Sequence, residues 1–525
     1  MTCPNFCAIR PRQWCACIFV AAASSMAEAE LQNVDVGGSI EVYGAYYSEF
    51  FADRNRAVWP DFFLPGRAIG PNGTVVYVDN DGHGNNTGFV EQRTKLNVRA
   101  DFTDNVSAFV ELDSVWNWGE DFRSDYVTGT ARRATSIPGD PEIFQAYIEA
   151  DELFGFPARL RIGRQTLAFG NEWLVGTNSD PDPFIEVSFD AVRLTLNHGP
   201  LTVDLWAAKL GESGINEEDG DTDFYGAYAS WDIGPNVEVD AYYMFLRDAR
   251  SINDTNFVAP IERLEHIAGL DDYDPTTLHT AGMRIAGEWN GFDYYAEAAY
   301  QWGEADALGA QFRFPGQLYG DDDARYDTFA GIFEFGYTFD VALQPRVFVA
   351  GAYFGADDRR DRSFADFLNP FARPEASVAF NRLFSSYRGT HYFDYSALSN
   401  YWLLRAGVEV ALTEKLSVSL DAMNYRVVEP FDVPHYVQLG DFRIPTAPAL
   451  SFWTKEGDDD LGVEIMLAPE YAYSEDLTFA MQLCYYFVGG AFDDGVFLDE
   501  YANRFMGGTG SEDAVSVTFL MSLSF

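Results

Sequence analysis

The residues whose types and spacing suggest chemistry most directly lie in the stretch RLRIGRQ, which begins at Arg159. Arg159, Arg161 and Arg164 are interleaved with Leu160 and Ile162, in a chain with 81 acidic residues, 35 basic residues and a formal net charge of −46. Guanidinium groups in such a chain are suited to pairing with carboxylates or to binding an anionic ligand. Their alternation with apolar residues predicts a strand with one wet face and one apolar face.

The same alternation recurs along the whole chain in stretches of about ten residues. In AVSVTFLMSLSF, Val517 and Phe519 lie on one face, and Ser516 and Thr518 on the other. About eighteen such strands are predicted, near residues 40–51, 94–103, 106–119, 143–152, 158–170, 189–198, 201–211, 222–233, 236–248, 278–290, 292–304, 326–340, 343–358, 400–414, 416–428, 458–474, 477–489 and 513–525.

The connections between these strands alternate in length. Tight turns such as Asn290-Gly291 alternate with long segments such as 52–93 and 359–399, and no segment has the unbroken apolar run of a transmembrane helix. The pattern predicts an all-β fold, a transmembrane antiparallel up-and-down β-barrel with short periplasmic turns and long extracellular loops. A β-propeller or tandem sandwiches is the soluble alternative, but no blade-length repeat is present.

The first residues have the features of an export signal. Arg10 and Arg12 form a basic region, an apolar region follows, and Ala27-Glu28-Ala29 is a small-x-small cleavage site. We therefore expect a signal peptide over 1–29 and a single outer-membrane barrel domain over 30–525, in a bacterium with a Gram-negative type of envelope.

A barrel of this size is too wide for side chains to fill, so we expect a water-filled lumen. Strand parity then assigns the lining, because an arginine facing lipid near the bilayer midplane costs about 2–4 kcal/mol. Two functions of the lining remain open, a track that carries an anionic solute and an ion-pair network that fixes strand register. The predicted pore-lining residues are Lys95, Arg99, Glu111, Asp113, Glu149, Arg159, Arg161, Arg164, Arg193 and Asp204.

Arg164 does not fit strict alternation, which points its side chain at lipid. Either a bulge at Gly163 shifts the parity by one residue, or Arg164 lies close enough to the rim for its charge to reach water.

Much of the acidic excess is expected in loops, in runs such as Asp321-Asp322-Asp323, Asp357-Asp358, Asp458-Asp459-Asp460 and 216–221. Clustered carboxylates bind divalent cations, although these spacings match no specific calcium loop. A solvated acidic surface is the alternative interpretation. The negative net charge argues against nucleic acid as a partner.

Several motifs in one region resemble the alginate-export family of outer-membrane porins. They are Gly163-Arg164-Gln165, Phe169-Gly170-Asn171-Glu172, Leu174-Val175-Gly176 and Phe189-Asp190-Ala191-Val192-Arg193-Leu194. The resemblance covers residues 140–210. It implies an eighteen-stranded barrel that passes anionic polysaccharide through an arginine-lined constriction. It also implies that Arg164 and Arg193 contact the solute, which favours the bulge at Gly163.

The resulting hypothesis is a channel that contacts outer-membrane lipid and passes an anionic solute, most specifically an alginate-like, uronate-type polysaccharide or oligosaccharide. The alternatives are a general diffusion porin for small solutes and a structural or adhesive protein with cation-binding acidic loops. We expect no enzyme, because the chain has six histidines and no serine nucleophile motif, and we expect no cofactor and no resident metal. Whether loop 359–399 folds into the pore is left open.

Overall fold

The computed structural model describes the strands, the short turns and parts of the long connections. The described residues are 31–48, 87–103, 105–119, 124–125, 130–131, 141–177, 184, 186–212, 221–249, 275–304, 324–355, 376–389, 399–428, 436–439, 442–445, 459–490, 496–498, 504–506 and 513–525. The predicted signal peptide and the acidic runs at 216–220, 321–323 and 357–358 lie outside them. In the described residues, no helix has the length and apolar character needed to cross a membrane.

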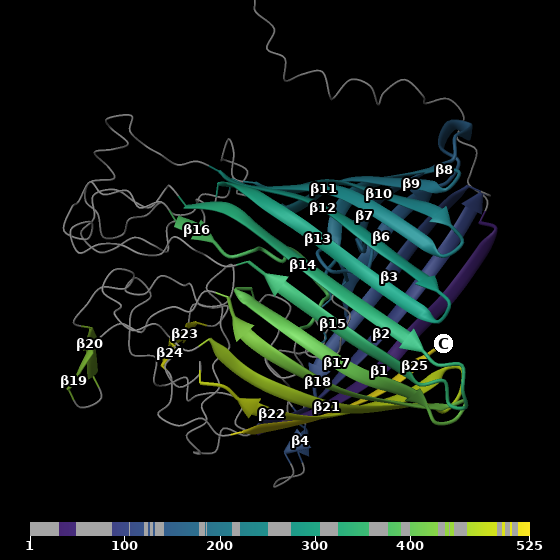
Figure 1. The fold of residues 1–525 in the computed structure, drawn as a ribbon. Helices are drawn as coiled ribbons and strands as arrows, with labels where there is room; N and C mark the ends of the chain where they lie inside the picture. Colours follow the sequence, from purple (N-terminus) through teal and green to yellow (C-terminus); the bar gives the residue numbers. More distant parts are fainter. Residues whose placement is uncertain are drawn as a thin grey trace, which may run out of the picture.

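Eighteen long strands, each antiparallel to its neighbours, form one closed barrel (Figure 1). The barrel closes where β1 pairs with β25, from Ser39 opposite Ser524 to Tyr47 opposite Ser516. The predicted fold class and strand number are confirmed. The barrel strands are β1 (Asn33–Tyr47), β2 (Thr87–Thr103), β3 (Val106–Asn117), β6 (Glu142–Ala150), β7 (Ala158–Gln165), β8 (Phe189–His198), β9 (Leu201–Gly211), β10 (Thr222–Gly234), β11 (Val237–Asp248), β12 (Thr276–Trp289), β13 (Phe292–Glu304), β14 (Ala324–Thr338), β15 (Arg346–Phe354), β17 (Tyr401–Ala411), β18 (Leu416–Val427), β21 (Asp460–Ala472), β22 (Leu477–Val488) and β25 (Ala514–Ser524).

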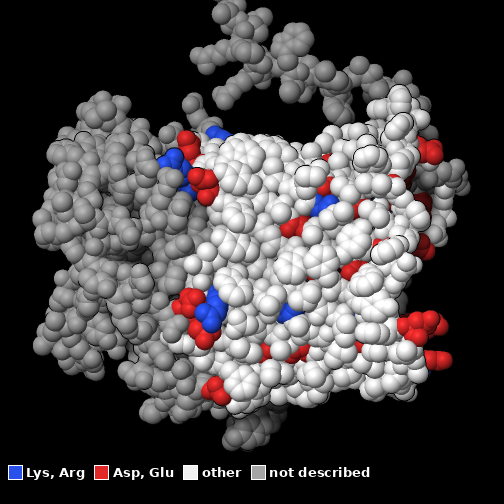
Figure 2. Space-filling model, viewed as in Figure 1, with Lys and Arg blue, Asp and Glu red and all other residues white. Residues whose placement is uncertain are grey.

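The two faces of the wall differ as the alternation predicts. On β25, Phe519 is 42% exposed, whereas Thr518 and Ser516 on the opposite face are buried. Ile148 and Met283 are 62% and 63% exposed at mid-strand positions. Figure 2 shows one side of the barrel, on which the outer wall is largely uncharged. An apolar surface of this extent is covered by lipid acyl chains in an outer-membrane barrel.

Short turns gather at one end of the barrel, where the C-terminus also lies, and the strand ends that the long connections join lie at the other end (Figure 1). Asn290 and Gly291 both have positive φ, 51° and 83°, which is the conformation of the two central residues of a tight hairpin turn. The predicted asymmetry of the connections is therefore present. In outer-membrane barrels the short turns lie on the periplasmic side, so this end corresponds to the periplasmic end and the other to the extracellular end.

Short secondary structure also occurs within the long connections. Three small hairpins are formed by β4 (Ser124–Asp125) with β5 (Thr130–Ala131), β19 (Tyr436–Leu439) with β20 (Phe442–Pro445), and β23 (Val496–Leu498) with β24 (Arg504–Met506). In addition, β16 (Ala376–Val378) pairs in parallel with the extracellular end of β14.

Strand boundaries differ from the predictions in places. β1 and β2 begin at Asn33 and Thr87, seven residues before the predicted 40 and 94. The long pairing of β1 with β2, from Asn33 opposite Asp101 to Tyr47 opposite Thr87, extends both strands. β7 ends at Gln165 rather than at 170, because the chain there leaves the wall and turns into the lumen.

Candidate functional site

The segment 166–177, which follows β7, folds into the lumen and is here called the first inward segment. Leu167, Trp173, Leu174 and Val175 are at most 2% exposed. Phe169 packs against two lumen-facing rings of the wall, Trp206 of β9 at 4.6 Å and Tyr228 of β10 at 5.0 Å between ring centroids. Burial of these apolar side chains stabilises the inward path of the segment.

The Glu172 carboxylate organises the first inward segment. Glu172 has a left-handed backbone conformation, with φ of 57°, and its Oε2 accepts three hydrogen bonds. The donors are the Thr177 backbone nitrogen at 2.9 Å, the Thr177 hydroxyl at 3.1 Å and the Ser386 hydroxyl at 2.7 Å. Position 176 requires glycine, because a Cβ there would lie 2.2 Å from the Ser386 Oγ.

Residues 379–389, here called the second inward segment, join the first across more than 200 positions of sequence. The Phe384 nitrogen donates to the Leu174 carbonyl at 2.9 Å, and the Gly176 nitrogen donates to the Phe384 carbonyl at 2.9 Å. The Ser386 nitrogen donates to the Glu172 carbonyl at 2.9 Å. The two segments form one hydrogen-bonded unit, called here the clasp. This answers the question left open for loop 359–399, because part of that loop does lie in the pore.

A buried arginine anchors the second inward segment to the wall. Arg382 is 1% exposed, and its guanidinium lies over the ring of Phe354 on β15 at 4.6 Å. Its Nη1 donates to the Tyr401 hydroxyl on β17 at 3.5 Å. Trp173 of the first inward segment stacks on Phe380 at 6.1 Å. Cation–π and stacking contacts therefore hold the clasp against one side of the barrel.

The chain beyond the first inward segment contacts the wall at β1 and β2. Phe184 packs edge-on against Tyr43 of β1 at 6.1 Å. Glu186 pairs with Arg93 at 2.6 Å and also with Lys95, both on β2. The connection between β7 and β8 thus contacts the wall from β1, through Phe184, to β12, through Asn171, and the second inward segment continues to β17. Together they narrow the lumen.

The predicted pore-lining residues, Arg164 excepted, alternate with the apolar outer face, and the basic ones are all paired. Lys95 pairs with Glu186 and lies 3.9 Å from Glu111. Asp113 pairs with Arg93 at 2.9 Å. Arg159 pairs with Asp151 at 2.8 Å, close to the periplasmic turn. The ion-pair network that was one of the two open interpretations is therefore present.

Three of these arginines, here called the basic row, lie near one another on the wall. Arg161 and Arg193 are directly opposite in the register of β7 and β8. Glu149 on β6 pairs with Arg161 at 2.6 Å and with Arg99 at 3.5 Å. The guanidinium of Arg193 pairs with Asp204 at 2.8 Å and lies 5.1 Å from the Phe169 ring centroid. Within the basic row, Arg193 therefore lies next to the first inward segment, and Arg161 lies opposite Arg193.

Arg164 is not part of that row, which corrects the predicted bulge. The register of β7 runs unbroken through Gly163 against both β6 and β8, so Arg164 stays on the outer face with Ile162. It makes two hydrogen bonds of 2.9 Å to Asp190. Arg164 is the penultimate residue of β7 at its extracellular end, where an outward charge costs about 0–1 kcal/mol. The rim alternative is the one that the structure supports.

Gly163 is nevertheless distorted. Its φ is 129°, and a Cβ there would lie 2.3 Å from the Ala146 carbonyl oxygen. Glycine is therefore required in this motif because β6 approaches closely, not because an extra residue is inserted.

Sequence reasoning missed several charged residues of the lumen. Arg93 is 1% exposed and has the parity of Lys95, so an earlier start for β2 would have included it. Arg284 on β12 is held by Glu238 and by Asp240 at 2.5 Å, and donates to Asn171 at 3.3 Å. Strand parity could have found Arg284, but its contact with the first inward segment has no sequence signal.

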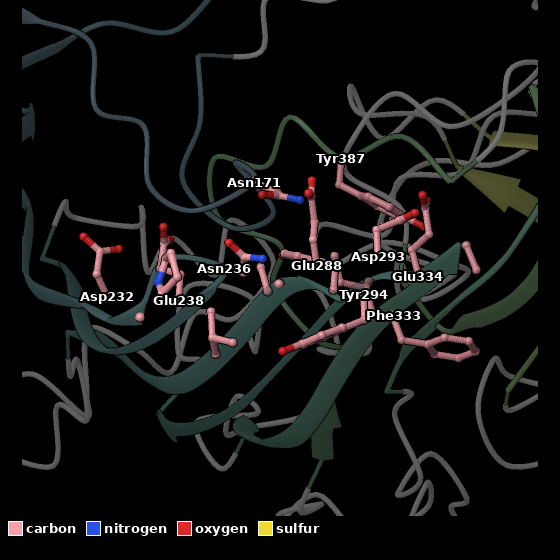
Figure 3. Close-up of a pocket in the computed structure, with 18 of the residues that line it drawn as sticks. Asn171, Asp232, Asn236, Glu238, Glu288, Asp293, Tyr294, Phe333, Glu334 and Tyr387 are labelled. Atoms are coloured by element: carbon pink, nitrogen blue, oxygen red, sulfur yellow. The ribbon is translucent and has the colours of Figure 1, made fainter. Parts of the chain in front are cut away.

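A cavity of about 730 Å³ lies in the lumen beside the clasp. Figure 3 shows Glu288, Asp293 and Glu334 extending from the wall toward Asn171 and Tyr387, which belong to the two inward segments. Arg346 pairs with Asp293 at 2.5 Å and with Glu334 at 2.6 Å. In the described part of the chain, no group of three or more metal-ligating side chains could hold a metal ion. Other lining residues include Asp232, Asn236, Glu238, Tyr295 and Arg405.

Comparison with known proteins gives a family match and several structural likenesses. A sequence profile described as "Alginate export" matches residues 81–505. No curated protein sequence matches the chain significantly. Similar solved structures include Acinetobacter baumannii OccAB1, with 12% identity, a TM-score of 0.48, and coverage of 93% of this chain and 96% of that one. Another is Pseudomonas aeruginosa OccD3 (OpdP), with 10% identity, a TM-score of 0.47, and coverage of 95% and 93%.

Proposed function

The chain belongs to the alginate export family and is an outer-membrane channel rather than an enzyme, and from this premise we propose its solute. It passes an anionic saccharide of the uronate type, as polysaccharide or oligosaccharide, through a lumen that carries the basic row. The protein lies in the outer membrane of a Gram-negative bacterium, where it contacts lipid.

One observation carries the proposal. Arg161 and Arg193 face each other across neighbouring strands, and like charges directly opposite in a sheet are destabilising. The side chain of Arg161 is 18% exposed and that of Arg193 is 21% exposed, so both remain accessible from the lumen. A carboxylate of a passing uronate would accept hydrogen bonds from both guanidiniums and relieve their repulsion.

The flanking carboxylates give the basic row a moderate affinity. Glu149 already accepts hydrogen bonds from Arg161, and Asp204 from Arg193. A passing anion therefore binds only the N–H groups that these carboxylates leave free, or competes with the carboxylates for the others. A channel needs binding that favours entry and still permits exit. Repeated exchange between protein and solute carboxylates would let a polymer advance one sugar at a time.

A second function, general diffusion of small solutes, is favoured by the same ion pairs. Each predicted basic lining residue other than Arg164 lies within 4 Å of a carboxylate, namely Lys95, Arg99, Arg159, Arg161 and Arg193. This part of the wall therefore has little net positive charge. A channel of that kind would show weak selectivity and no binding of oligosaccharides.

Electrical recording from the purified protein in planar bilayers separates the two functions. The proposal predicts that an oligomannuronate hexamer interrupts the current in discrete events, and that a neutral hexasaccharide does so less. Uninterrupted current with both sugars, together with a reversal potential that shows preference for cations, would favour the general porin instead.

The division of the chain is also a proposal. We propose that 1–29 is removed as a signal peptide and that 30–525 forms the barrel domain, as the basic, apolar and small-residue regions of the N-terminus suggest. Sequencing the N-terminus of protein purified from outer membranes tests it.

A further inference from the structure

We propose that the cavity beside the clasp is a second saccharide subsite, one that binds sugar hydroxyl groups rather than carboxylates. The inference rests on the proposed function, because it assumes that a saccharide enters the lumen. It concerns a different set of strands, β10 to β15 and β17, from those that carry the basic row.

The size and chemistry of the cavity suit a saccharide. Its volume of about 730 Å³ lies within the range of pockets that hold small molecules. The lining combines carboxylates, side-chain amides, tyrosines and one arginine. A sugar hydroxyl both donates and accepts, so a mixed lining of acceptors and donors suits it better than a lining of one kind.

Polar groups also remain exposed in the cavity. Glu288 and Asn171 are exposed. Arg284 donates to the Asn171 Oδ1 at 3.3 Å, which fixes the amide and leaves its NH₂ group to donate elsewhere. In Figure 3 the Glu288 side chain extends from the wall toward Asn171. An acceptor and a donor therefore flank the same space, one on the wall and one on the first inward segment.

The charges of this wall favour hydroxyl groups over carboxylates. Asp293 and Glu334 are partly neutralised by Arg346, whereas no described residue is seen to pair with the Glu288 carboxylate. This wall therefore repels the carboxylate of a uronate and accepts hydrogen bonds from its hydroxyls. A uronate chain would direct its carboxylates toward the basic row and its hydroxyl edges toward Glu288 and Asn171.

The test uses an oligomannuronate hexamer and its carboxyl-reduced, neutral counterpart, which has the same linkage and only hydroxyl groups. Residence times of each oligomer are measured from current interruptions in planar bilayers. We expect Glu288→Ala and Asn171→Ala to shorten the residence of the neutral oligomer by about three- to tenfold, because each variant loses one or two hydrogen bonds.

Glu470→Ala is the matched control, since Glu470 is exposed near the periplasmic end of β21 and does not line the cavity. It should leave the residence time unchanged. An unchanged residence time of the neutral oligomer in both cavity variants would overturn the inference, as would a residence time that requires Ca²⁺ and is lost with a chelator. The cavity would then be lining only, or a cation site.

The same recordings keep this inference separate from the proposed function. If Arg161→Gln shortens the residence of the charged oligomer while the cavity variants change nothing, the inference fails and the proposed function stands. If the two oligomers behave alike and Arg161→Gln affects neither, the proposed function fails, whatever the cavity variants do.

Discussion

Arg161 and Arg193 lie directly opposite each other in the register of β7 and β8, and each is bonded to a carboxylate on its far side rather than to its neighbour. Glu149 holds Arg161 at 2.6 Å, and Asp204 holds Arg193 at 2.8 Å. The two guanidiniums therefore have partners that stabilise them, while both side chains remain partly exposed.

The clasp is predicted to limit conductance. Glu172→Ala removes the acceptor of three hydrogen bonds, so the two inward segments should separate more often and single-channel conductance should rise. Ser386→Ala removes only one of the three bonds and should give a smaller rise. Equal conductance of wild type and Glu172→Ala in planar bilayers would show that the clasp does not set the width of the pore.

The buried ion pairs that Arg93 of β2 makes with Asp113 and Glu186 are predicted to be important for stability. Arg93→Met leaves Asp113 and Glu186 without their shared partner, so the free energy of unfolding should fall by about 3–5 kcal/mol. Arg159→Met is the comparison, because the 46% exposed Arg159 pairs with a 40% exposed Asp151 and such a pair contributes about 0–1 kcal/mol. Urea unfolding in lipid vesicles measures both. Similar losses for the two variants would contradict the assignment.

Gly163 is predicted to tolerate no side chain. Gly163→Ala places a Cβ against the Ala146 carbonyl in a conformation that only glycine adopts readily. The variant should show less heat-modifiable, folded barrel on gels. Gly44→Ala, whose Cβ would have its nearest neighbour at 3.9 Å, should fold normally. Normal folding of both variants would mean that β6 and β7 can separate at this point.

The outer face is predicted to reject charge. Met283→Arg places a guanidinium on the lipid face of β12 and should destabilise the barrel by about 2–4 kcal/mol. Ser419→Arg, which lies opposite Glu409 on the lumen side, should cost little. If both variants unfold at the same urea concentration, the assignment of the two faces is wrong.

The strand plan of the barrel could be predicted because its physical cause is local. Alternation at period two records which face of each strand meets lipid, and Asn290-Gly291 has the backbone preference that a tight turn needs. Register extends this to most of the lumen, since Glu149 and Arg161 follow from parity alone. Arg93 was missed only because the predicted β2 began at residue 94, directly after it.

The constriction could not be predicted in the same way. Its contacts join Glu172 to Ser386 and Asn171 to Arg284, and no periodicity links positions so distant in sequence. The one available signal was composition, because LAFGNEWLVG contains too many large apolar residues for a loop in water. Arg164 was predicted to face the lumen because the family resemblance favoured a bulge at Gly163. The structure does require glycine at 163, but because β6 approaches closely there and not because of a bulge.

The most direct test of the central claim is the double variant Arg161→Gln, Arg193→Gln, compared with Arg164→Gln on the outer face of the same strand. Residence times of an oligomannuronate hexamer are measured in planar bilayers. The account predicts that the double variant shortens residence by tenfold or more, as expected when two hydrogen bonds to a charged group are lost, and that Arg164→Gln leaves it unchanged. Equal residence in all three proteins, or an effect of Arg164→Gln alone, would contradict the account.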